Sequence, residues 1–356
     1  MMTQKLTSIG YQVHRSNNTG QCILNIQDKF KNNSISDWFL GRSILITGGA
    51  GYLGTNLIHA LKNVECNIFR LDKEDAVFEP VHGLMNLTDL KGDVRHSSCW
   101  EKVIGEIDIV FHFAAQTSSY IANEDPPADL ENNVVPILRL LEACRKTGVK
   151  KTVLFASTAT IVGLTPRLPV NEDFPDNPIT MYDLHKLMAE QYLKYYTRFE
   201  MVSGAILRLS NVYGPGPRSS RPDRGILNQM TKRAVEGKTL TVYGEGNYLR
   251  DYVHVEDVVR AFLNAAVHVD ALNGRHYIIG SGRGYTIKES MQLVADRVLL
   301  KSGRPVTIEH VEPPTPQSPI ESRNFVADTS NFGGLTGWKP SYDLIRGVDQ
   351  MIERLL

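Results

Sequence analysis

GGAGYLG, residues Gly48 to Gly54, is the stretch of sequence that decides the fold. It follows the apolar, β-branched run Ser43 to Thr47, which is typical of a buried parallel strand. It leads into Tyr52 to Leu61, where apolar residues recur with a helical period. A glycine turn lets the backbone approach a ligand closely, and the following helix offers unpaired N–H groups to phosphates. The order of strand, turn and helix therefore predicts a diphosphate site.

The acid that follows this unit indicates which dinucleotide binds. The glycine spacing G-x-x-G-x-x-G is one residue longer at the front than the fingerprint G-x-G-x-x-G. A second apolar run, Cys66 to Leu71, ends at Asp72, close to the distance of about 20 residues at which a carboxylate binds the adenosine ribose. A carboxylate would repel a 2′-phosphate, so NAD is favoured over NADP. A glycine-rich β-turn with a coincidental Asp is the alternative. The residues expected to contact NAD here are Gly48, Gly51, Tyr52, Leu53, Gly54 and Asp72.

Composition limits the class of protein. The 356 residues can bury a large core, and they predict two lobes. Lys plus Arg equals Asp plus Glu, 39 each, so no nucleic acid or charged membrane partner is indicated. The four cysteines are scattered without metal-binding spacing, which predicts reduced thiols and no metal. We find no apolar run of membrane-spanning length and no signal-peptide pattern, so we expect a cytoplasmic protein.

The chain divides into three parts. Residues 1–41 form an N-terminal extension that packs on the main domain or lies partly loose. From there β and α patterns alternate, which predicts an α/β fold with a doubly wound parallel Rossmann sheet over 42–210. Residues 211–356 change to longer loops and short elements, which predicts a smaller, interleaved C-terminal substrate domain. Segments near 251–280 are expected to return to the large sheet, because His276 to Ile279 is typical of a strand.

The elements expected between the glycine turn and the second lobe are read from apolar runs and helical periods. Three are strands and two are helices. The strands are Ile107–Phe113, Lys151–Phe155 and Ala205–Leu209, and the helices are Leu130–Lys146 and Met181–Phe199.

Two pairs of residues follow strands at the edge where open α/β sheets bind ligands. Asp93 and Val94 come after a short strand, and an acid at this place can meet the adenine amino group. A solvated loop Asp explains Asp93 equally well. Ala114 and Ala115 end the fourth strand, and small residues there let a flat cofactor approach the backbone. We therefore add these four residues to the predicted NAD contacts.

A tyrosine and a lysine carry the predicted chemistry. Tyr182 and Lys186 are four residues apart on one helix, so their side chains share a face. A phenol titrates near pH 10, but a cation about 5 Å away contributes roughly 3 kcal/mol at an effective dielectric of about 20, or about two pKa units. With the positive charge of oxidised nicotinamide, Lys186 makes Tyr182 a general base near pH 7. Thr158 supplies a hydroxyl between Tyr182 and a substrate alcohol. An ordinary amphipathic helix is the alternative.

Together these motifs resemble the NAD-dependent sugar epimerase/dehydratase family of extended short-chain dehydrogenase/reductases. The resemblance covers about Arg42 to Leu356. The motifs that carry it are Thr47 to Gly54, His112 to Ala115, Ser157 to Ala159, Tyr182-x-x-x-Lys186, Arg208 to Pro215, and Arg250 to Val255.

The resemblance implies a nucleotide-diphosphate sugar as substrate. Asn211 and Arg250 of this chain match positions that hold the diphosphate in such proteins. Arg323 matches a further arginine of their site. Two arginines can clamp two phosphates through charge-assisted hydrogen bonds. Taken singly, each arginine is more often a solvated surface residue. The family also implies a homodimer that forms through the helix with Tyr182 and the helix before it.

The reaction is the finer question. The family's first step moves the proton of the sugar C4 hydroxyl to tyrosine and the C4 hydride to NAD, giving a 4-keto sugar. A 4,6-dehydratase has Asp-Glu directly after the catalytic Thr, and decarboxylases commonly keep a Glu at the second position, where this chain has Ala159-Thr160. The resemblance therefore favours a C4-epimerase of a UDP- or similar nucleotide sugar. Thr158 in place of Ser, and Val162 in place of an aromatic residue, depart from the epimerase pattern. A 4-dehydrogenase or 4-ketoreductase, a dehydratase or decarboxylase, and a non-catalytic NAD-binding regulatory protein are the alternatives.

Overall fold

The computed structural model describes residues 33–84, 86–217, 225–313 and 318–356. Most of the predicted extension, including Cys22, lies outside the described residues. Its last part forms helix α2 (Asn33–Phe39), in which Phe39 is fully buried. The Phe39 ring lies 6.5 Å from that of Phe111 in the large sheet, so this end of the extension packs on the main domain.

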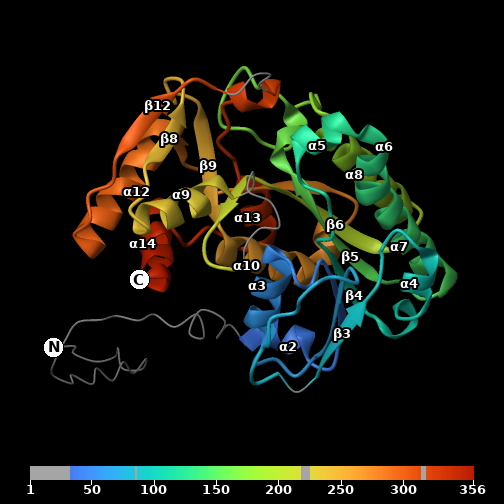
Figure 1. Ribbon diagram of the computed structural model, residues 1–356. Helices are drawn as coiled ribbons and strands as arrows, with labels where there is room; N and C mark the ends of the chain where they lie inside the picture. The colour runs from blue at the N-terminus through green and yellow to red at the C-terminus, as the bar shows by residue number, and fades with distance from the viewer. Residues whose placement is uncertain (1–32, 85, 218–224, 314–317) are drawn as a thin grey trace, which may run out of the picture.

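A seven-stranded parallel sheet forms the centre of the molecule, in the order β10-β6-β5-β4-β1-β2-β3 (Figure 1). The chain runs from β1 outward to β3 and then crosses to β4 on the other side of β1. The switch point therefore lies beside β1, where doubly wound sheets bind their ligands. The predicted fold class is confirmed. The strands are β1 (Ser43–Thr47), β2 (Asn67–Asp72), β3 (Leu87–Lys91), β4 (Ile109–His112), β5 (Thr152–Thr158), β6 (Ser203–Leu209) and β10 (His276–Ile279).

Helices cover both faces of this sheet. Alternate residues of a strand point to opposite faces, and both sets are apolar here, so both faces have to be covered. Ile44 and Ile46 belong to one core with α2, α3 and α10, whereas Leu45 belongs to a second core with α4, α7 and α8. Figure 1 shows α3 and α10 on one side of the sheet and α7 and α8 on the other. The helices of this lobe are α3 (Tyr52–Leu61), α4 (Ser97–Glu101), α5 (Ser119–Glu124), α6 (Pro126–Asn133), α7 (Val135–Lys146), α8 (Met181–Arg198), α10 (Val255–Val267), α11 (Val269–Leu272) and α13 (Ser330–Thr336), with 3₁₀ turns η1 (Ile104–Glu106) and η2 (Ala159–Val162).

The predicted helix over Leu130–Lys146 is wrong as a single element. Two helices, α6 and α7, meet at Val134. Pro136 has no N–H to donate to the carbonyl of Asn132, which interrupts the helical ladder at this point. The Asn133 side chain instead donates to the Gln116 carbonyl oxygen at 3.0 Å. The break therefore fixes Asn133 and the end of α6 against the loop that follows β4.

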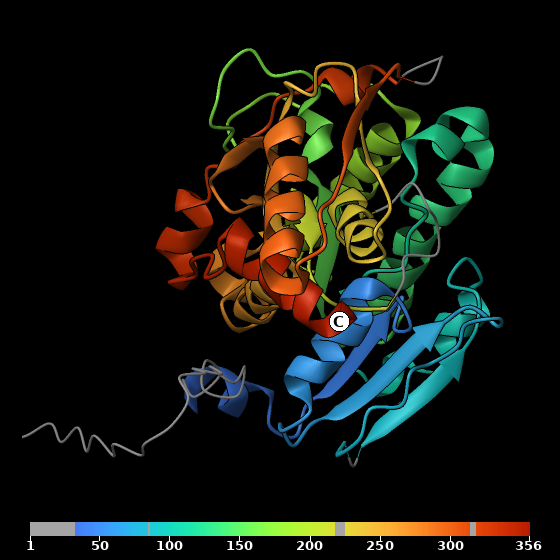
Figure 2. The same cartoon turned by 60° about the vertical axis from the view of Figure 1, so that its left-hand side comes forward.

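A second lobe of short strands and helices lies beside the large sheet (Figure 2). Its core joins α9, α12 and α14 to the strands β8 and β9. The predicted return of His276–Ile279 to the large sheet is confirmed, because β10 pairs with β6 in parallel. The elements are β7 (Asn211–Tyr213), α9 (Ile226–Val235), β8 (Leu240–Tyr243), β9 (Leu249–His254), β11 (Gly284–Thr286), α12 (Ile287–Ser302), β12 (Ile308–Val311), η3 (Pro319–Ser322) and α14 (Leu344–Leu355), in two sheets ordered β11-β9-β7 and β12-β8.

Among the described residues, no helix is long and apolar enough to cross a membrane. The same part of the chain contains no cluster of three or more His, Cys, Asp or Glu side chains that would hold a metal ion.

Candidate active site

The glycine turn between β1 and α3 is closely packed. Gly48 has a φ of +67°, and a Cβ atom there would lie 2.9 Å from the backbone nitrogen of Ala114. A Cβ atom on Gly54 would collide with the carbonyl oxygen of Gly48. Gly51 is the N-cap of α3, and its N–H donates to Gly48 at 2.9 Å. Only glycine at these places lets the first turn of α3 approach so closely, which leaves a cradle for a diphosphate at the helix N-terminus.

Asp72 and the end of β4 flank this turn, as predicted from the sequence. The Asp72 carboxylate accepts from the Ala50 N–H at 3.0 Å and from the Lys73 N–H at 2.9 Å. Thr47 Oγ1 accepts from the Ala114 N–H at 3.2 Å, so β1 is tied to the small residues that end β4. The next residue, Ala115, is exposed. Asp72, Ala114 and Ala115 thus lie at the carboxyl ends of the strands on either side of β1, next to the switch point.

Tyr52 joins the glycine turn to the second lobe, a contact that the sequence pattern did not predict. Its hydroxyl donates to the carbonyl oxygen of Gly214 at 2.8 Å, and burial raises the pKa of this phenol. Gly216 lies against the ring, because a Cβ atom there would come within 2.6 Å of it. Leu53, the next residue of α3, is half-buried against the first core.

Asp93 follows β3 and is paired within its own loop. Arg95 binds both carboxylate oxygens, with Nη2 at 2.6 Å from Oδ2, and this ion pair lowers the pKa of Asp93. The carbonyl of Val94 accepts from the Trp100 indole at 2.8 Å. An adenine amino group would therefore share the Asp93 carboxylate with Arg95. The predicted adenine contact stays a prediction.

The candidate base lies at the start of α8. Tyr182 is half-buried, and Lys186, one turn later, is 2% exposed. The Lys186 ammonium lies 4.0 Å from the centre of the Phe155 ring in β5. Burial lowers the pKa of Lys186 to about 7, and the carboxylates of Glu190 and Asp129 oppose that shift. A buried cation favours a negative charge close to it, and a phenolate at Tyr182 would be such a charge.

A neutral histidine, His112, packs on the same phenylalanine ring as Lys186. His112, at the end of β4, stacks on Phe155 with ring centres 5.9 Å apart. Its Nδ1 lies 2.8 Å from Thr47 Oγ1. Burial, together with the charge of Lys186, lowers the pKa of His112 to about 3. This imidazole is therefore uncharged at neutral pH and adds no repulsion to Lys186.

Two buried networks hold α8, and sequence reasoning missed both. Glu190 accepts two hydrogen bonds from Arg208, at 2.9 and 2.7 Å, and one from Ser157 at 2.6 Å. Asp129 lies 2.7 Å from His185 Nδ1 and accepts from the Gln116 and Asn133 side chains. A buried lysine requires nearby counter-charges. The sequence could therefore have indicated that acids lie near Lys186, but it does not indicate which acids supply these counter-charges.

Thr158 ends β5, at the expected edge of the sheet. Its hydroxyl lies 2.7 Å from that of Thr160, which in turn donates to the carboxylate of Asp183. Asp183 follows Tyr182 directly in α8 and is 1% exposed. Sequence reasoning missed Asp183, although an acid beside the candidate base was visible in the sequence.

The three predicted diphosphate residues come together in the second lobe. Arg323 Nη2 donates to Asn211 Oδ1 at 3.2 Å. Arg250 donates to the carbonyl oxygen of Arg323 at 2.5 Å and to that of Glu321 at 2.8 Å, and the Glu321 carboxylate lies 3.6 Å away. Burial and the charge of Arg250 lower the pKa of Arg323 to about 10. The negative charges of Glu321 and Asp183 oppose this shift, and two adjacent guanidinium groups favour the binding of a phosphate.

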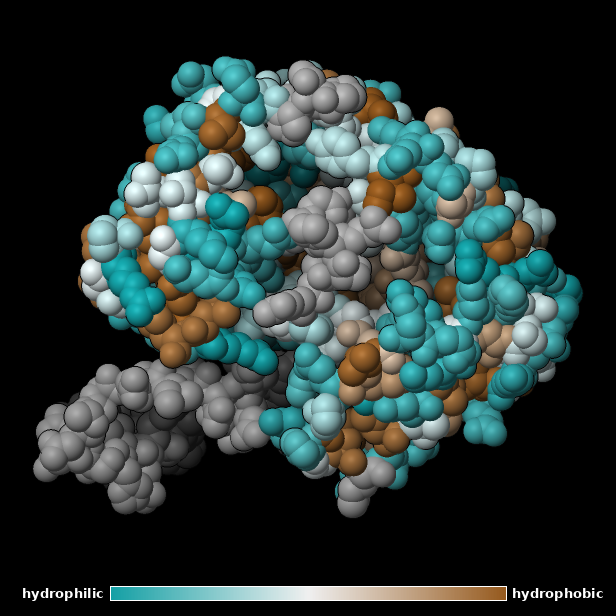
Figure 3. All heavy atoms as spheres, viewed as in Figure 1, coloured by the Kyte–Doolittle hydropathy of each residue, from teal (hydrophilic) through white to brown (hydrophobic). Residues whose placement is uncertain are grey.

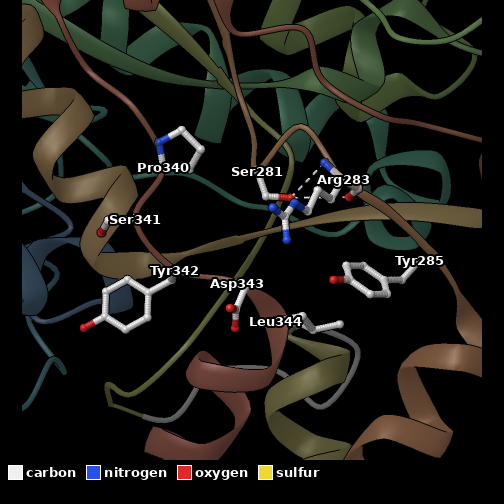
Figure 4. Close-up of a pocket in the computed structure, with 8 residues that line it drawn as sticks. All are labelled: Ser281, Arg283, Tyr285, Pro340, Ser341, Tyr342, Asp343 and Leu344. Carbon is white, nitrogen blue, oxygen red and sulfur yellow. Dashed lines mark hydrogen bonds between the residues drawn. The ribbon is translucent and has the colours of Figure 1, made fainter.

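The surface between the lobes is hollowed, and hydrophilic residues form much of its rim in Figure 3. A separate cavity of about 220 Å³ lies where the 281–285 segment meets the start of α14 (Figure 4). Its walls include Ser281, Arg283 and Tyr285 and none of the predicted site residues. This cavity is therefore not the candidate active site.

Comparison with known proteins defines the class. Residues 44–280 match the family model described as the NAD dependent epimerase/dehydratase family. The chain belongs to this family, and NAD is the family's cofactor.

Individual relatives are similar along nearly their whole length. A putative UDP-glucose 4-epimerase of Methanocaldococcus jannaschii is 29% identical over 316 residues, which cover 87% of this chain and 97% of that protein. A CDP-paratose 2-epimerase of Salmonella typhi is 28% identical over 338 residues, covering 87% and 98%. The crystal structure of UDP-glucose 4-epimerase from Bifidobacterium longum in complex with NAD+ and UDP superposes with a TM-score of 0.77 at 26% identity, covering 87% and 97%.

The residues present fit the cofactor. A Cβ atom on Gly48 or Gly54 would clash with backbone atoms, so both glycines let the turn and α3 pack closely against β4, with the N-terminus of α3 at the turn. Such a terminus favours a diphosphate, because its N–H groups and dipole are positive.

Proposed function

We propose that this protein is an NAD-dependent nucleotide-sugar 4-epimerase that works through a transient 4-keto sugar. The observation that carries the proposal is the arrangement at the start of α8. Lys186 is buried one turn beyond Tyr182, and the negative charges of Glu190 and Asp129 act on it. Thr158 ends the neighbouring strand, and the glycine cradle opens at the same edge of the sheet.

In the proposed reaction Tyr182 accepts the proton of the sugar C4 hydroxyl, and Lys186 stabilises the phenolate that does so. Thr158 hydrogen-bonds to the same sugar oxygen. Bound NAD would supply the acceptor, and then the donor, of the C4 hydride. The keto sugar then rotates so that its other face points toward the nicotinamide site, and Tyr182 returns the proton to the C4 oxygen. The residues proposed to hold NAD are Gly48, Gly51, Tyr52, Leu53, Gly54, Asp72, Asp93, Val94, Ala114, Ala115, Tyr182 and Lys186.

The turn after β5 supports an epimerase over a dehydratase. Ala159 is apolar and Thr160 is neutral, so neither supplies the Asp-Glu pair that the resemblance associates with 4,6-elimination. The similarity to both a putative UDP-glucose 4-epimerase and a CDP-paratose 2-epimerase supports a nucleotide sugar as substrate. We propose a UDP-sugar, because UDP-glucose 4-epimerases recur among the relatives.

The direct test is product analysis. The full-length protein with NAD is incubated separately with UDP-glucose, UDP-galactose, UDP-N-acetylglucosamine, UDP-glucuronate and CDP- or dTDP-glucose, and products are identified by NMR. We expect one of these sugars to reach an equilibrium mixture of its C4 epimers without net formation of NADH. A 4-keto-6-deoxy product would show a dehydratase, and stoichiometric NADH would show a dehydrogenase. Either result would overturn the proposal.

Arg323→Met tests the proposed diphosphate clamp. A charge-assisted hydrogen bond contributes roughly 1.5–3 kcal/mol, so we expect the affinity for UDP to fall by about 10- to 100-fold. Isothermal titration of the NAD-loaded protein with UDP measures this change. Arg323→Lys should keep part of the affinity, because it keeps the charge.

Arg283→Met is the matched control for this clamp. Arg283 is an exposed arginine of the same lobe that lines the separate cavity (Figure 4). We expect it to leave UDP binding unchanged. Equal affinities for the wild type and Arg323→Met would remove Arg323 from the site.

The remaining proposals concern organisation. We propose that residues 42–210 bind NAD, residues 211–356 mainly bind the nucleotide sugar, and two copies dimerise through α7 and α8. Tyr195 and Phe199 near the end of α8 are each 54% exposed with rings 4.7 Å apart, which supports such a contact. Sedimentation of the protein measures its mass in solution. A cytoplasmic location is also proposed, supported by the free thiols of the three described cysteines.

A further inference from the structure

Three side chains form a continuous hydrogen-bonded chain that begins at the candidate catalytic threonine and ends inside the protein. The hydroxyls of Thr158 and Thr160 are 2.7 Å apart. Thr160 Oγ1 donates to Asp183 Oδ1, and Thr180 Oγ1 donates to Asp183 Oδ2 at 2.7 Å. Both carboxylate oxygens of Asp183 are therefore occupied by hydroxyl donors.

The direction of this chain follows from the number of hydrogens available. An ionised carboxylate only accepts hydrogen bonds, and a hydroxyl has one hydrogen to donate. Since Thr160 gives its hydrogen to Asp183, Thr158 must give its own to Thr160. Toward the substrate, Thr158 is then left as an acceptor. A sugar alcohol, which has a hydrogen to donate, matches that state.

A keto sugar needs the opposite direction, because its carbonyl oxygen can only accept. The chain reverses when Asp183 gains a proton, since Asp183 then donates to Thr160, Thr160 to Thr158, and Thr158 to the sugar oxygen. One proton separates the two states. That proton equals the one that the sugar loses when its alcohol becomes a ketone.

Resting on the proposed function, we propose that Thr158, Thr160 and Asp183 form a proton relay that gives the sugar hydroxyl proton a second acceptor besides Tyr182. The sugar O4–H bond breaks as an O–H bond forms on Thr158. The former hydrogen of Thr158 passes to Thr160, and that of Thr160 passes to Asp183, which becomes a neutral carboxyl group. The electron pair of the C4–H bond leaves with the hydride, whose acceptor is NAD. In the return step each proton moves back.

The surroundings of Asp183 suit a group that gains and loses a proton. Burial raises the pKa of Asp183, while its hydrogen bonds from Thr160 and Thr180 and the charge of Arg323 oppose the increase. Arg323 is also a proposed diphosphate ligand. The charge of the proposed substrate clamp therefore acts on the last group of the relay.

Substitution at Thr160 tests the relay with a small change in volume. Thr160→Val removes the middle hydroxyl, and Thr160→Ser keeps it. We expect Thr160→Val to lower kcat of the epimerisation about tenfold and Thr160→Ser to restore most of the rate. The dependence of kcat on the fraction of D2O should be curved in the wild type, where several protons move, and close to linear in Thr160→Val. Thr165→Val, at a half-buried threonine that donates to the carbonyl oxygen of Asn324, is the control and should retain the curved dependence.

A second experiment measures the protonation of Asp183 and does not depend on enzyme activity. The ¹³C carboxyl signal of Asp183, assigned by its loss in Asp183→Asn, is titrated in the protein without substrate. Loss of the Thr160 donor removes a bond that favours the charged form, so Thr160→Val should raise the titration midpoint by about one unit, whereas Thr165→Val should not.

The outcomes separate the relay from the proposed function. A wild type that epimerises no nucleotide sugar contradicts the proposed function, and the titration still reports the hydrogen-bonded chain. An active wild type whose rate and D2O dependence match those of Thr160→Val contradicts the relay. An Asp183 titration that is the same in the wild type and in Thr160→Val shows that the chain does not form and contradicts it as well.

Discussion

Tyr182→Phe is expected to lower kcat of the proposed epimerisation by about 1000-fold, the largest effect of any single substitution in this chain. The substitution removes one oxygen and leaves the ring in place. General acid–base groups contribute typically 10²–10⁴ to a rate, and here the same oxygen serves both the outward and the return proton transfer. Initial rates at saturating nucleotide sugar measure the loss.

The control for this variant is Tyr192→Phe on the same helix. Tyr192 packs against the second core and has no place in the proposed chemistry. It should keep the wild-type rate, and both variants should retain NAD. A Tyr182→Phe protein with full activity would remove Tyr182 as the base and leave the family assignment untouched.

Lys186→Met is expected to have the second largest effect, and one that depends on pH. Burial lowers the pKa of Lys186 to about 7, and a phenolate at Tyr182 favours its charged form, so the two groups titrate together. A cation about 5 Å from the phenol lowers the phenol's pKa by about two units, so removing it should reduce the rate at pH 7 by up to about 100-fold. The ascending limb of the rate profile should move to higher pH by about the same two units. The loss should therefore shrink as the pH rises, because hydroxide then ionises Tyr182 without help.

A pH profile of kcat for the wild type and Lys186→Met tests this expectation. Lys238→Met, at an exposed lysine paired with Glu236, is the control and should leave the profile in place. A loss that stays constant from pH 6 to pH 10 would mean that Lys186 acts by holding structure rather than through its charge. The two results are distinguished by the slope of the profile alone.

Local patterns of the sequence predicted those parts of the candidate site that lie within one short segment of the chain. Gly48 to Gly54 could be predicted because strand, turn and helix follow each other directly along the chain. Tyr182 and Lys186 could be read because a helix brings fourth neighbours together. The family resemblance added Asn211, Arg250 and Arg323, and the structure places these three side chains in one cluster.

Contacts between segments that are distant in the sequence could not be predicted from local patterns. The hydrogen bond from Tyr52 to Gly214 joins residues 162 apart, and nothing in either local pattern specifies it. The pairing of His185 with Asp129 depends on where α6 ends, and that end was missed because apolar spacing ran through Val134 without interruption. The chain from Thr158 to Asp183 likewise needs the relative placement of a strand end and a helix start.

The position of β10 has a consequence for how the two lobes can be exchanged or separated. The outer neighbour of β6 comes from residues 276–279, after the chain has already built part of the second lobe. A fragment that stopped at residue 210 would leave β6 as an open edge, with unpaired backbone groups that invite aggregation. The nucleotide-binding half is thus not complete at residue 210. A chimera that grafts a new sugar specificity onto this scaffold must keep α10 and β10 with the nucleotide-binding half.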